Sequence, residues 1–479
     1  MSHISRLFIL HTNDVHSCFE NMPKLAARIA QYRQTYLPDE LLTVDCGDHL
    51  DRVRLETEGT GGLANIAVLN ESGYELFVPG NNEGLTFPKA IFENVFREHA
   101  NFSVLGTNML ELQTGSVPPW MFSRLIINKS GFRIGIIGVT ASFNDFYRLL
   151  GWNVTEPQHA IAEAVSELRA KVELVLVVSH VGLIFDRQLA ELVPGIDCII
   201  GGHTHHLLEQ AEQIGQTTIG AAGKSGTHLG VIEIEYDPVD LTLKHIAGHA
   251  ENVTDEKDEP RVAAIIESYR SISLAAMQKQ ITVLDEPIPH NLRTESELGN
   301  LLADGLRKWT ESEVGIVNSG QLLNGLSSGT LTHVDLLSVC PSPINPCSVM
   351  LYGSELVLAL EQSLMDEYID MAVRGYGFRG KVLGSLCVSG MDIIYDKTSP
   401  DFHKIKSVWI GNQPIEPERL YKVGTIDMFT FGVGYPTLGT NREIHYYLPE
   451  FIRDVLQKEL ASPIPNTYRK QLHWKQTSF

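Results

Sequence analysis

Five short apolar segments of the chain each end in side chains that can bind a metal ion. In chain order these side chains are Asp14, His16, Asp48, Asn81, His180, His203 and His205. Their imidazole, carboxylate and amide donors suit Mn, Zn or Fe better than calcium, and thiolate is absent. Asp14 and His16, like His203 and His205, are two residues apart, so in an extended segment each pair points to one side and can hold one ion. The pattern therefore predicts a site for transition-metal ions.

Each of these residues also has a simpler interpretation. Asp-x-His and Gly-Asp occur in turns and helix caps, and the tandem Asn81 and Asn82 after Pro-Gly suit a turn. The stretch "GGHTHH" suits a flexible loop whose third histidine, His206, faces solvent. However, five successive segments with the same kind of ending in one α/β pattern favour the metal site.

The segments that must position these residues alternate between two patterns. Strands are predicted at 7–10, 41–44, 75–78, 102–105, 133–139, 174–178 and 198–200, and helices at 23–36, 62–71, 88–98 and 157–171. This alternation indicates a mixed or parallel sheet covered by helices. Ligands of such sheets bind beyond the carboxyl ends of the strands, so the five endings can converge on one place.

The composition narrows the possible partners. The 479 residues are 43% hydrophobic and 20% charged, as in a soluble globular protein of two or three domains. The net charge of −20 repels a nucleic-acid backbone, so no polynucleotide partner is expected. A small phosphorylated ligand would need a local positive centre, either an arginine cluster or bound metal ions.

The location of the protein is predicted from its cysteine spacing and from the lack of long apolar segments in the sequence. The six cysteines show no C-x-x-C spacing, which indicates neither a zinc knuckle nor a disulfide framework. The first residues lack the long apolar core of a secretory signal, and no stretch approaches a membrane span. We expect a cytoplasmic protein with no membrane partner.

Three regions are predicted along the chain. Residues 1–250 form the metal-binding domain, whose last strand is expected at 231–236. Residues 251–285 form a linker helix, charged first and then periodic in apolar residues over 257–280. Residues 286–479 form a second domain, which begins with a helix at about Ser296 and continues with several short strands.

The metal-binding motifs resemble those of a known family. Asp14-x-His16, Gly47-Asp48, Gly80-Asn81, Ser179-His180 and Gly202-His203-Thr204-His205 are similar, in this order, to the motifs of calcineurin-like metallophosphoesterases. The start "LHTNDVHS" and the downstream region resemble the 5'-nucleotidase family, and its cytoplasmic bacterial phosphoesterases in particular. The resemblance covers nearly the whole chain. It implies an N-terminal αββα sheet sandwich, a linker helix and a mixed α+β C-terminal substrate-binding domain.

The resemblance also implies a cofactor and a reaction. Two divalent ions of Mn, Zn, Fe or Co are expected, one held by Asp14, His16, Asp48 and His205, the other by Asp48, Asn81, His180 and His203, with Asp48 bridging them. The implied activity is hydrolysis of a phosphate ester of a nucleotide or other small phosphorylated metabolite. A metal-bound hydroxide attacks phosphorus, and no phosphoenzyme forms.

The chain departs from the family after Asn81. The family motif Gly-Asn-His-Glu-Phe-Asp supplies a His-Asp dyad to the transition state, but Asn82 and Leu85 stand at those two positions. Asparagine cannot deliver a proton near neutral pH, and general acid catalysis contributes about 10²- to 10⁴-fold. We therefore expect either leaving groups that need little protonation or another proton donor. His49 is a candidate donor; its alternative is a structural role beside Asp48.

The second half departs from the family in its nucleoside contacts. The stretch "NSGQLL" keeps Asn318 as a candidate substrate residue but has Leu323 in place of the family arginine. Val433 stands in place of a ribose-binding aspartate, and Ser385 in place of a base-stacking phenylalanine. These departures weaken the prediction of a nucleotide substrate.

The stretch "RGYGFRG", residues 374–380, is the candidate replacement. Arg374, Phe378 and Arg379 offer guanidinium groups for phosphate and an aromatic ring for stacking. The alternative is a glycine-rich surface loop with solvated arginines.

Three functions follow from these features. The first is an active phosphohydrolase, and the second is a phosphodiesterase or nucleotide-sugar diphosphatase of the same family. The third is a catalytically weak protein that binds metal and ligand. The seven ligands favour an active enzyme, whereas the missing dyad and nucleoside contacts favour the third function.

Overall fold

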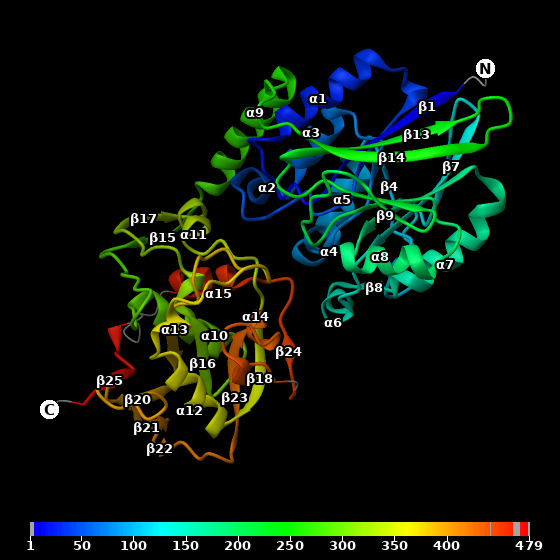
Figure 1. Ribbon diagram of the computed structural model, residues 1–479. Helices are drawn as coiled ribbons and strands as arrows, with labels where there is room; N and C mark the ends of the chain where they lie inside the picture. The colour runs from blue at the N-terminus through cyan, green and yellow to red at the C-terminus, as the bar shows by residue number, and fades with distance from the viewer. Residues whose placement is uncertain (1–3, 441, 463–469, 478–479) are drawn as a thin grey trace. The chain divides into compact units, whose positions relative to one another are not determined.

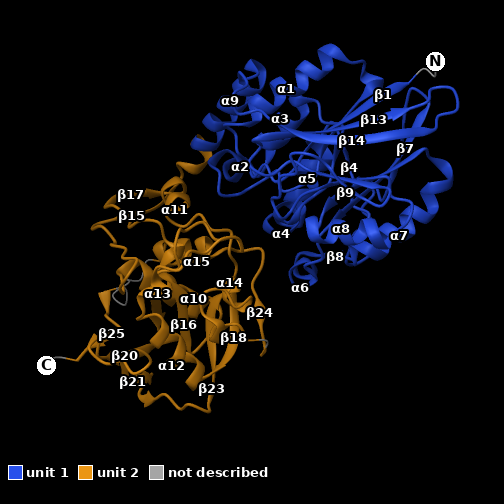
Figure 2. Ribbon diagram, viewed as in Figure 1, with its two compact units in different colours: residues 1–274 blue, residues 275–479 orange. Residues whose placement is uncertain are grey.

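The computed structural model describes residues 4–440, 442–462 and 470–477. The chain divides into two compact units, Met1–Leu274 and Ala275–Phe479 (Figure 2). The division falls inside helix α9 (Pro260–Met277), which is shorter than the predicted helix. The predicted linker also contains the end of strand β14 (Leu243–Asn252) and strand β15 (Gln280–Leu284), so it is not all helix.

Unit 1 contains two six-stranded sheets (Figure 1). The first has the order β14, β13 (His228–Tyr236), β1 (Ser5–Thr12), β2 (Leu41–Asp45), β3 (Leu76–Phe77) and β4 (Ser103–Val104). The second has the order β11 (Glu212–Ile214), β12 (Thr217–Ala221), β10 (Cys198–Gly201), β9 (Leu174–His180), β7 (Phe132–Thr140) and β6 (Leu125–Lys129). Strands β1 to β4 are parallel, as are β7, β9, β10 and β12. The alternating pattern did not reveal this division into two sheets.

The two sheets pack face to face. One buried cluster joins Leu7 and Val44 of the first sheet to Ile136 and Leu176 of the second. Helices cover the outer faces: α1 (Met22–Thr35) places Tyr32 on Phe8, and α5 (Lys89–His99) places Phe96 on Phe77. On the second sheet, α7 (Pro157–Leu168) and α8 (Leu183–Leu192) bury their apolar sides in another cluster. The expected αββα sandwich is confirmed.

Because both faces of these sheets are covered, their central strands are buried along their whole length and are mostly apolar. Every residue of β9 is buried, as is every residue of β2 and β10. Such strands appear in the sequence as continuous apolar runs, not as alternating ones. The strands therefore hold their carboxyl ends in a rigid framework, from which the polar ligand segments extend.

Unit 2 is a mixed α+β domain, as predicted. Its five-stranded sheet has the order β19 (Leu386–Ser389), β16 (Val314–Asn318), β23 (Leu420–Ile426), β18 (Pro346–Tyr352) and β24 (His445–Tyr446). A second sheet has the order β22 (Gln413–Pro414), β21 (Ile405–Ile410), β20 (Met391–Tyr395) and β25 (Trp474–Gln476). Helix α10 (Glu297–Trp309) begins where Ser296 Oγ accepts a hydrogen bond from the Gly299 amide, and it packs on the five-stranded sheet.

Two further features of the described residues bear on location. None of their helices is both long enough and apolar enough to cross a membrane. All six cysteines are free thiols, and five of them are buried.

Candidate dinuclear metal centre

The predicted ligands come together at the carboxyl ends of five strands from both sheets. Asp14 and His16 follow β1, Asp48 follows β2 and Asn81 follows β3, while His180 ends β9 and the His203 segment follows β10. Backbone hydrogen bonds join the first two segments: the Asp14 amide donates to the Gly47 carbonyl, and the His16 amide donates to the Asp48 carbonyl, both at 2.9 Å. The strand framework therefore fixes the spacing between ligand segments that are far apart in the sequence.

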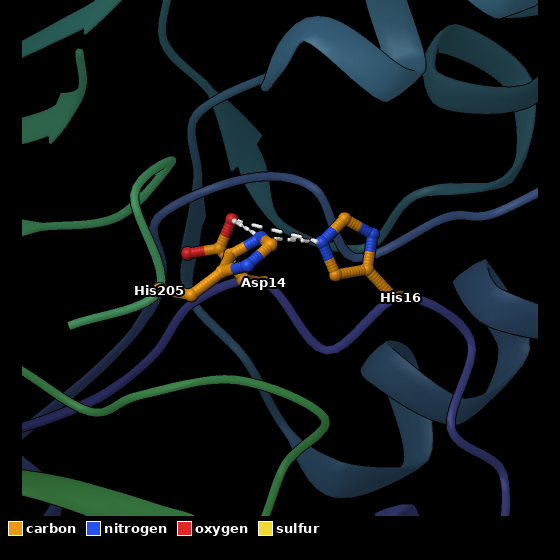
Figure 3. Close-up of side chains that lie close together, drawn as sticks. All are labelled: Asp14, His16 and His205. Carbon is orange, nitrogen blue, oxygen red and sulfur yellow. Dashed lines mark hydrogen bonds and ion pairs between the residues drawn. The ribbon is translucent and has the colours of Figure 1, made fainter. Parts of the chain in front are cut away.

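Asp14, His16 and His205 form one ligand group (Figure 3). The two histidines present Nε2 to each other at 3.1 Å, and Asp14 Oδ1 lies 3.8 Å from His16 Nε2 and 3.5 Å from His205 Nε2. Three donor atoms from the two sheets thus surround one small volume.

Asp14, Asp48 and His180 form a second, fully buried group. His180 Nε2 lies 3.3 Å from Asp48 Oδ1 and 4.0 Å from Asp14 Oδ1. The other Asp48 oxygen, Oδ2, lies 4.0 Å from His16 Nε2. The Asp48 carboxylate therefore faces a histidine of each group with a different oxygen, which is the arrangement that a bridging ligand needs.

Asn81 and His203 complete the cluster beside His180. His203 Nδ1 lies 2.8 Å from Asn81 Oδ1, and the rings of His203 and His180 are 5.3 Å apart. The His203 backbone amide also donates to Asp14 Oδ2 at 2.9 Å. The structure therefore brings all seven predicted ligands together.

The ligand segments have an unusual backbone. Five of the seven predicted ligands have positive φ angles, namely Asp14 (49°), His16 (47°), Asp48 (51°), His203 (76°) and His205 (59°). Left-handed backbone is uncommon outside glycine, and strained residues of this kind cluster at functional sites. Gly80 adds a steric constraint, because a Cβ there would overlap the Asp48 carboxylate and crowd His180 Nε2. The framework thus holds side chains in positions that a relaxed chain would avoid.

Burial sets the charge of the ligands. It lowers the pKa of His203 and of His205 to about 4, so both rings are neutral at pH 7, the form that binds metal. Burial acts to lower the pKa of His180, but the charge of Asp48 outweighs it and raises that pKa to about 10. Burial acts to raise the pKa of Asp48, but His180 and His16 hold it well below its usual range.

The residues present fit a pair of divalent cations. His180 Nδ1 lies 2.7 Å from the Cys46 carbonyl, which fixes the ring, while the buried Nε2 makes no hydrogen bond within the described part of the chain. A cation between His180 and Asp48 would give Nε2 a partner. The mixed nitrogen and oxygen donors suit Mn, Zn, Fe or Co.

Asn82 lies directly beside the cluster, in the first turn of α4 (Asn81–Thr86). Its backbone amide donates to Asp48 Oδ1 at 2.7 Å, and its side-chain Nδ2 lies 3.0 Å from His16 Nδ1 and 3.2 Å from the Leu50 carbonyl. The side chain therefore lies against a predicted metal ligand, and its amide cannot act as an acid near neutral pH.

His49 does not fit the predicted role of replacement proton donor. Its side chain is 1% exposed, and its Nδ1 lies 3.0 Å from Asp45 Oδ2, which also accepts a hydrogen bond from Thr12. Because β2 continues into the buried turn at Cys46, His49 points into the interior and away from solvent. We therefore correct this expectation: His49 is a buried structural residue.

Sequence reasoning missed Glu83, which braces the ligand segments. This side chain is fully buried, and its carboxylate accepts backbone hydrogen bonds from Asp48 (3.0 Å), Leu50 (2.8 Å) and Gly80 (2.8 Å). Glu83 thus ties the segment after β2 to the segment after β3. Its position inside a run of polar residues resembles a turn, so only the fold reveals this role.

We expect Glu83→Gln to weaken Mn²⁺ binding by about 10- to 100-fold, as loss of outer hydrogen-bonding partners of metal ligands typically does. In the native protein both carboxylate oxygens of Glu83 accept hydrogen bonds from backbone N–H groups. In the variant the glutamine NH₂ group would replace one of these oxygens, so that two donors would face each other. Calorimetric titration with Mn²⁺ measures the effect, and Glu98→Gln on the exposed surface of α5 is the matched control. Equal affinities for the two variants would remove the bracing role.

Of the four substrate residues predicted in unit 2, two are buried and two are accessible to solvent. Asn318 is fully buried and is engaged with the Leu383 carbonyl and with Gln321, so it is not available to a ligand. Phe378 is 5% exposed and packs in the core of unit 2. Arg374 is exposed and Arg379 is half-buried. The predictions for Asn318 and Phe378 are therefore corrected. The Asn318 amide is used in a hydrogen bond to a backbone carbonyl, and the Phe378 ring is buried in the apolar core.

Comparison with known proteins identifies the class to which this fold and site belong. A family model for calcineurin-like phosphoesterases matches residues 8–207, and a model for the 5'-nucleotidase C-terminal domain matches residues 278–440. The chain belongs to the calcineurin-like phosphoesterases that carry a 5'-nucleotidase C-terminal domain. It is 33% identical over 460 residues to the uncharacterized metallophosphoesterase YunD of Bacillus subtilis, covering 95% of this chain and 99% of that protein.

Solved structures share the fold at lower identity. NAD nucleotidase of Haemophilus influenzae has a TM-score of 0.70 at 17% identity, and the match covers 99% of this chain and 100% of that chain. A putative 5'-nucleotidase of Staphylococcus aureus has a TM-score of 0.71 at 16% identity, with 98% of this chain and 100% of that chain covered. Membership of the family makes this protein a metal-dependent phosphoester hydrolase.

Proposed function

We propose that this protein hydrolyses the phosphate ester of a small phosphorylated metabolite, nucleotides included, at a dinuclear metal centre held by the seven predicted ligands. The observation that carries the proposal is the Asp48 carboxylate, whose two oxygens face His180 and His16. Two divalent ions at such a site would supply Lewis-acid charge for the phosphoryl oxygens and a more acidic water. This is also the local positive centre that a chain of net charge −20 needs to hold a phosphate.

The side chains around the centre would keep its geometry during reaction. The Cys46 carbonyl fixes the His180 ring, and the His203 backbone amide holds the Asp14 carboxylate. The Asn82 side-chain amide lies against His16 Nδ1 and the Leu50 carbonyl, and it cannot protonate a leaving group. The proposed activity is therefore greatest on phosphates whose leaving group is weakly basic.

A second candidate function follows from the same side chain. Hydrolysis of a nucleotide-sugar diphosphate expels a phosphate ester, which needs little protonation. This bond therefore suits a centre with Asn82 better than an alkyl phosphate or an alkyl phosphodiester, each of which expels an alcohol. We place hydrolysis of a diphosphate bond second, because the bond that is cleaved depends on contacts outside the metal centre.

Unit 2 presents an exposed aromatic pair that differs from the one predicted. Tyr376 and Phe431 are 54% and 47% exposed, and their ring centres lie 5.6 Å apart at 33°. Arg374 is exposed in the same loop as Tyr376. We propose that this surface of unit 2 binds a ring through Tyr376 and Phe431, and that Arg374 and Arg379 attract an anionic group. A ring-bearing substrate is favoured by this surface.

A substrate screen tests the proposed function. Purified protein with Mn²⁺ or Co²⁺ would be offered phosphomonoesters, nucleotide sugars and cyclic nucleotides, and phosphate release and bound metal would be measured. We expect turnover of at least one phosphorylated metabolite with a ring. If two metals are bound and no compound is turned over, the protein is a metal- and ligand-binding relative and the proposal fails.

A further inference from the structure

The strand next to β9 in the second sheet is followed by none of the predicted metal ligands. The segment after β10 supplies His203 and His205, β9 ends at His180, and β7 is the next parallel strand. Thr140, the last residue of β7, pairs with His180 in the register, and the backbone amide of Ala141 donates to the His180 carbonyl at 3.0 Å. The segment after β7 therefore begins directly beside a metal ligand.

This segment places an aromatic ring against another ligand. The ring centre of Phe143 lies 5.8 Å from that of His203, and the two ring planes make an angle of 53°. The Phe143 side chain is 36% exposed. Apolar surface is stabilised when it is removed from water, so an exposed ring gains free energy from an apolar partner. A molecule bound beside His203 could supply that partner.

Hydrogen bonds hold Phe143 in this position. Phe143 directly precedes α6 (Asn144–Tyr147), which is joined to β8 (Trp152–Val154). The Asn144 side chain donates through Nδ2 to the Val154 carbonyl at 2.6 Å, and its Oδ1 accepts from the Val154 amide at 2.9 Å. The ring is thus carried by an anchored turn, and the fold defines its place at the metal centre.

Helix α6 also packs against α4, the helix that carries Asn82 (Figure 1). Tyr147 of α6 is fully buried and occupies the space that a side chain at Gly84 of α4 would need. A Cβ on Gly84 would come within 2.6 Å of Tyr147 Cε1. The glycine therefore allows the two helices to approach closely. Phe143 and Asn82 are thus held by helices that support each other beside the metal ligands.

Phe143 and Asn82 favour the same kind of substrate. Asn82 cannot protonate a leaving group, so the centre suits a leaving group that is weakly basic. Phenolate is such a group, because the pKa of a phenol is about 10. Its flat ring can also pack against an aromatic side chain. A phosphate ester of a phenol meets both requirements, whereas a simple alkyl phosphate meets neither.

We propose that Phe143 determines the specificity of the metal centre and that the substrate is a phosphate ester of a phenolic compound. The aryl group packs against the Phe143 ring beside His203, while the phosphoryl group lies at the metal ions. This inference rests on the proposed hydrolysis and adds to it a contact that the metal ligands do not provide.

Two phosphonates test this contact without hydrolysis, because neither contains an ester bond. Phenylphosphonate and methylphosphonate have the same anionic group, and only the first has a ring. Calorimetric titration of the Mn²⁺-loaded full-length protein measures both affinities. We expect phenylphosphonate to bind about 10-fold more tightly, which is within the range of one aromatic contact. Equal affinities, or no binding of either compound, would overturn the inference.

Variants of Phe143 locate the contact. Phe143→Ala should weaken phenylphosphonate binding by about 10-fold and leave the binding of methylphosphonate and of Mn²⁺ unchanged. Phe143→Tyr keeps the ring and should bind as the native protein does. Leu37→Ala is the matched control, because Leu37 is 67% exposed and lies at the amino end of β2, opposite to Asp48. Equal weakening of both phosphonates, or weaker Mn²⁺ binding, would show that Phe143 only supports His203.

Kinetics separate this inference from the proposed function. On p-nitrophenyl phosphate, Phe143→Ala should raise KM with little change in kcat, as loss of a uniform binding contact does, and rates on ethyl phosphate should not change. If the native protein hydrolyses phosphate esters but Phe143→Ala changes neither KM nor phenylphosphonate binding, the proposed function stands and this inference is wrong. A native protein that binds no Mn²⁺ would overturn both.

Discussion

Asp48→Asn is expected to remove both metal loading and hydrolysis. Asp48 is the one side chain whose two oxygens face both histidine groups, at 3.3 Å from His180 Nε2 and 4.0 Å from His16 Nε2. The amide keeps the shape of the side chain but removes the negative charge and one acceptor atom. Metal charge stabilises phosphoryl transfer by several kcal/mol, and about 1.4 kcal/mol changes a rate tenfold, so kcat/KM should fall by about 10³-fold or more.

Elemental analysis and phosphate release from an aryl phosphate measure these two effects. Asp39→Asn, at an exposed position outside the ligand segments, is the matched control and should behave as the native protein. A folded Asp48→Asn protein that keeps full activity would show that the metal centre is misplaced.

Asn82→His is expected to raise the rate on alkyl phosphates more than on aryl phosphates. The Asn82 side chain lies 3.0 Å from His16 Nδ1, and its backbone amide binds Asp48 Oδ1, so a histidine here would stand directly at the centre. An alkyl leaving group needs a proton and an aryl one does not. General acid catalysis contributes about 10²- to 10⁴-fold when well placed, and about 10-fold is expected from an imidazole without the partner aspartate that Leu85 replaces.

Rates on matched alkyl and aryl phosphates measure this difference. Asn82→Ala is the control that removes the amide without adding an imidazole. It should lower the rates of hydrolysis of the alkyl and the aryl phosphate by the same factor. If Asn82→His changes both rates by the same factor, the leaving-group explanation of Asn82 is wrong.

The sequence reveals the metal centre because its ligands follow strands that are recognisable by themselves. The buried run of β9 ends at His180, and β2 ends three residues before Asp48, so local apolar patterns place both side chains at a sheet edge. The type of residue then indicates the chemistry. These inferences need no knowledge of which strands are neighbours.

The division into two sheets and the bracing role of Glu83 depend on tertiary packing. Short stretches of sequence do not reveal such packing. The two sheets are distinguished only by pairing between distant segments, and Glu83 is recognisable as a brace only once β2 and β3 are adjacent. Phe378 looked available because Gly377 and Arg379 flank it, and His49 because it directly follows Asp48. The fold buries both of them, and in the same loop it exposes Tyr376 instead.

Metal titration of chelator-stripped protein tests the central claim most directly. Mn²⁺ would be added stepwise while bound metal and phosphate release from p-nitrophenyl phosphate are measured on the same samples. The account predicts two bound ions per chain, with activity that appears as the second ion binds, because Asp48 and Asp14 each face ligands of both groups. Full activity with no metal or a single metal bound, or two bound ions without hydrolysis of this or any other phosphate ester, would contradict it.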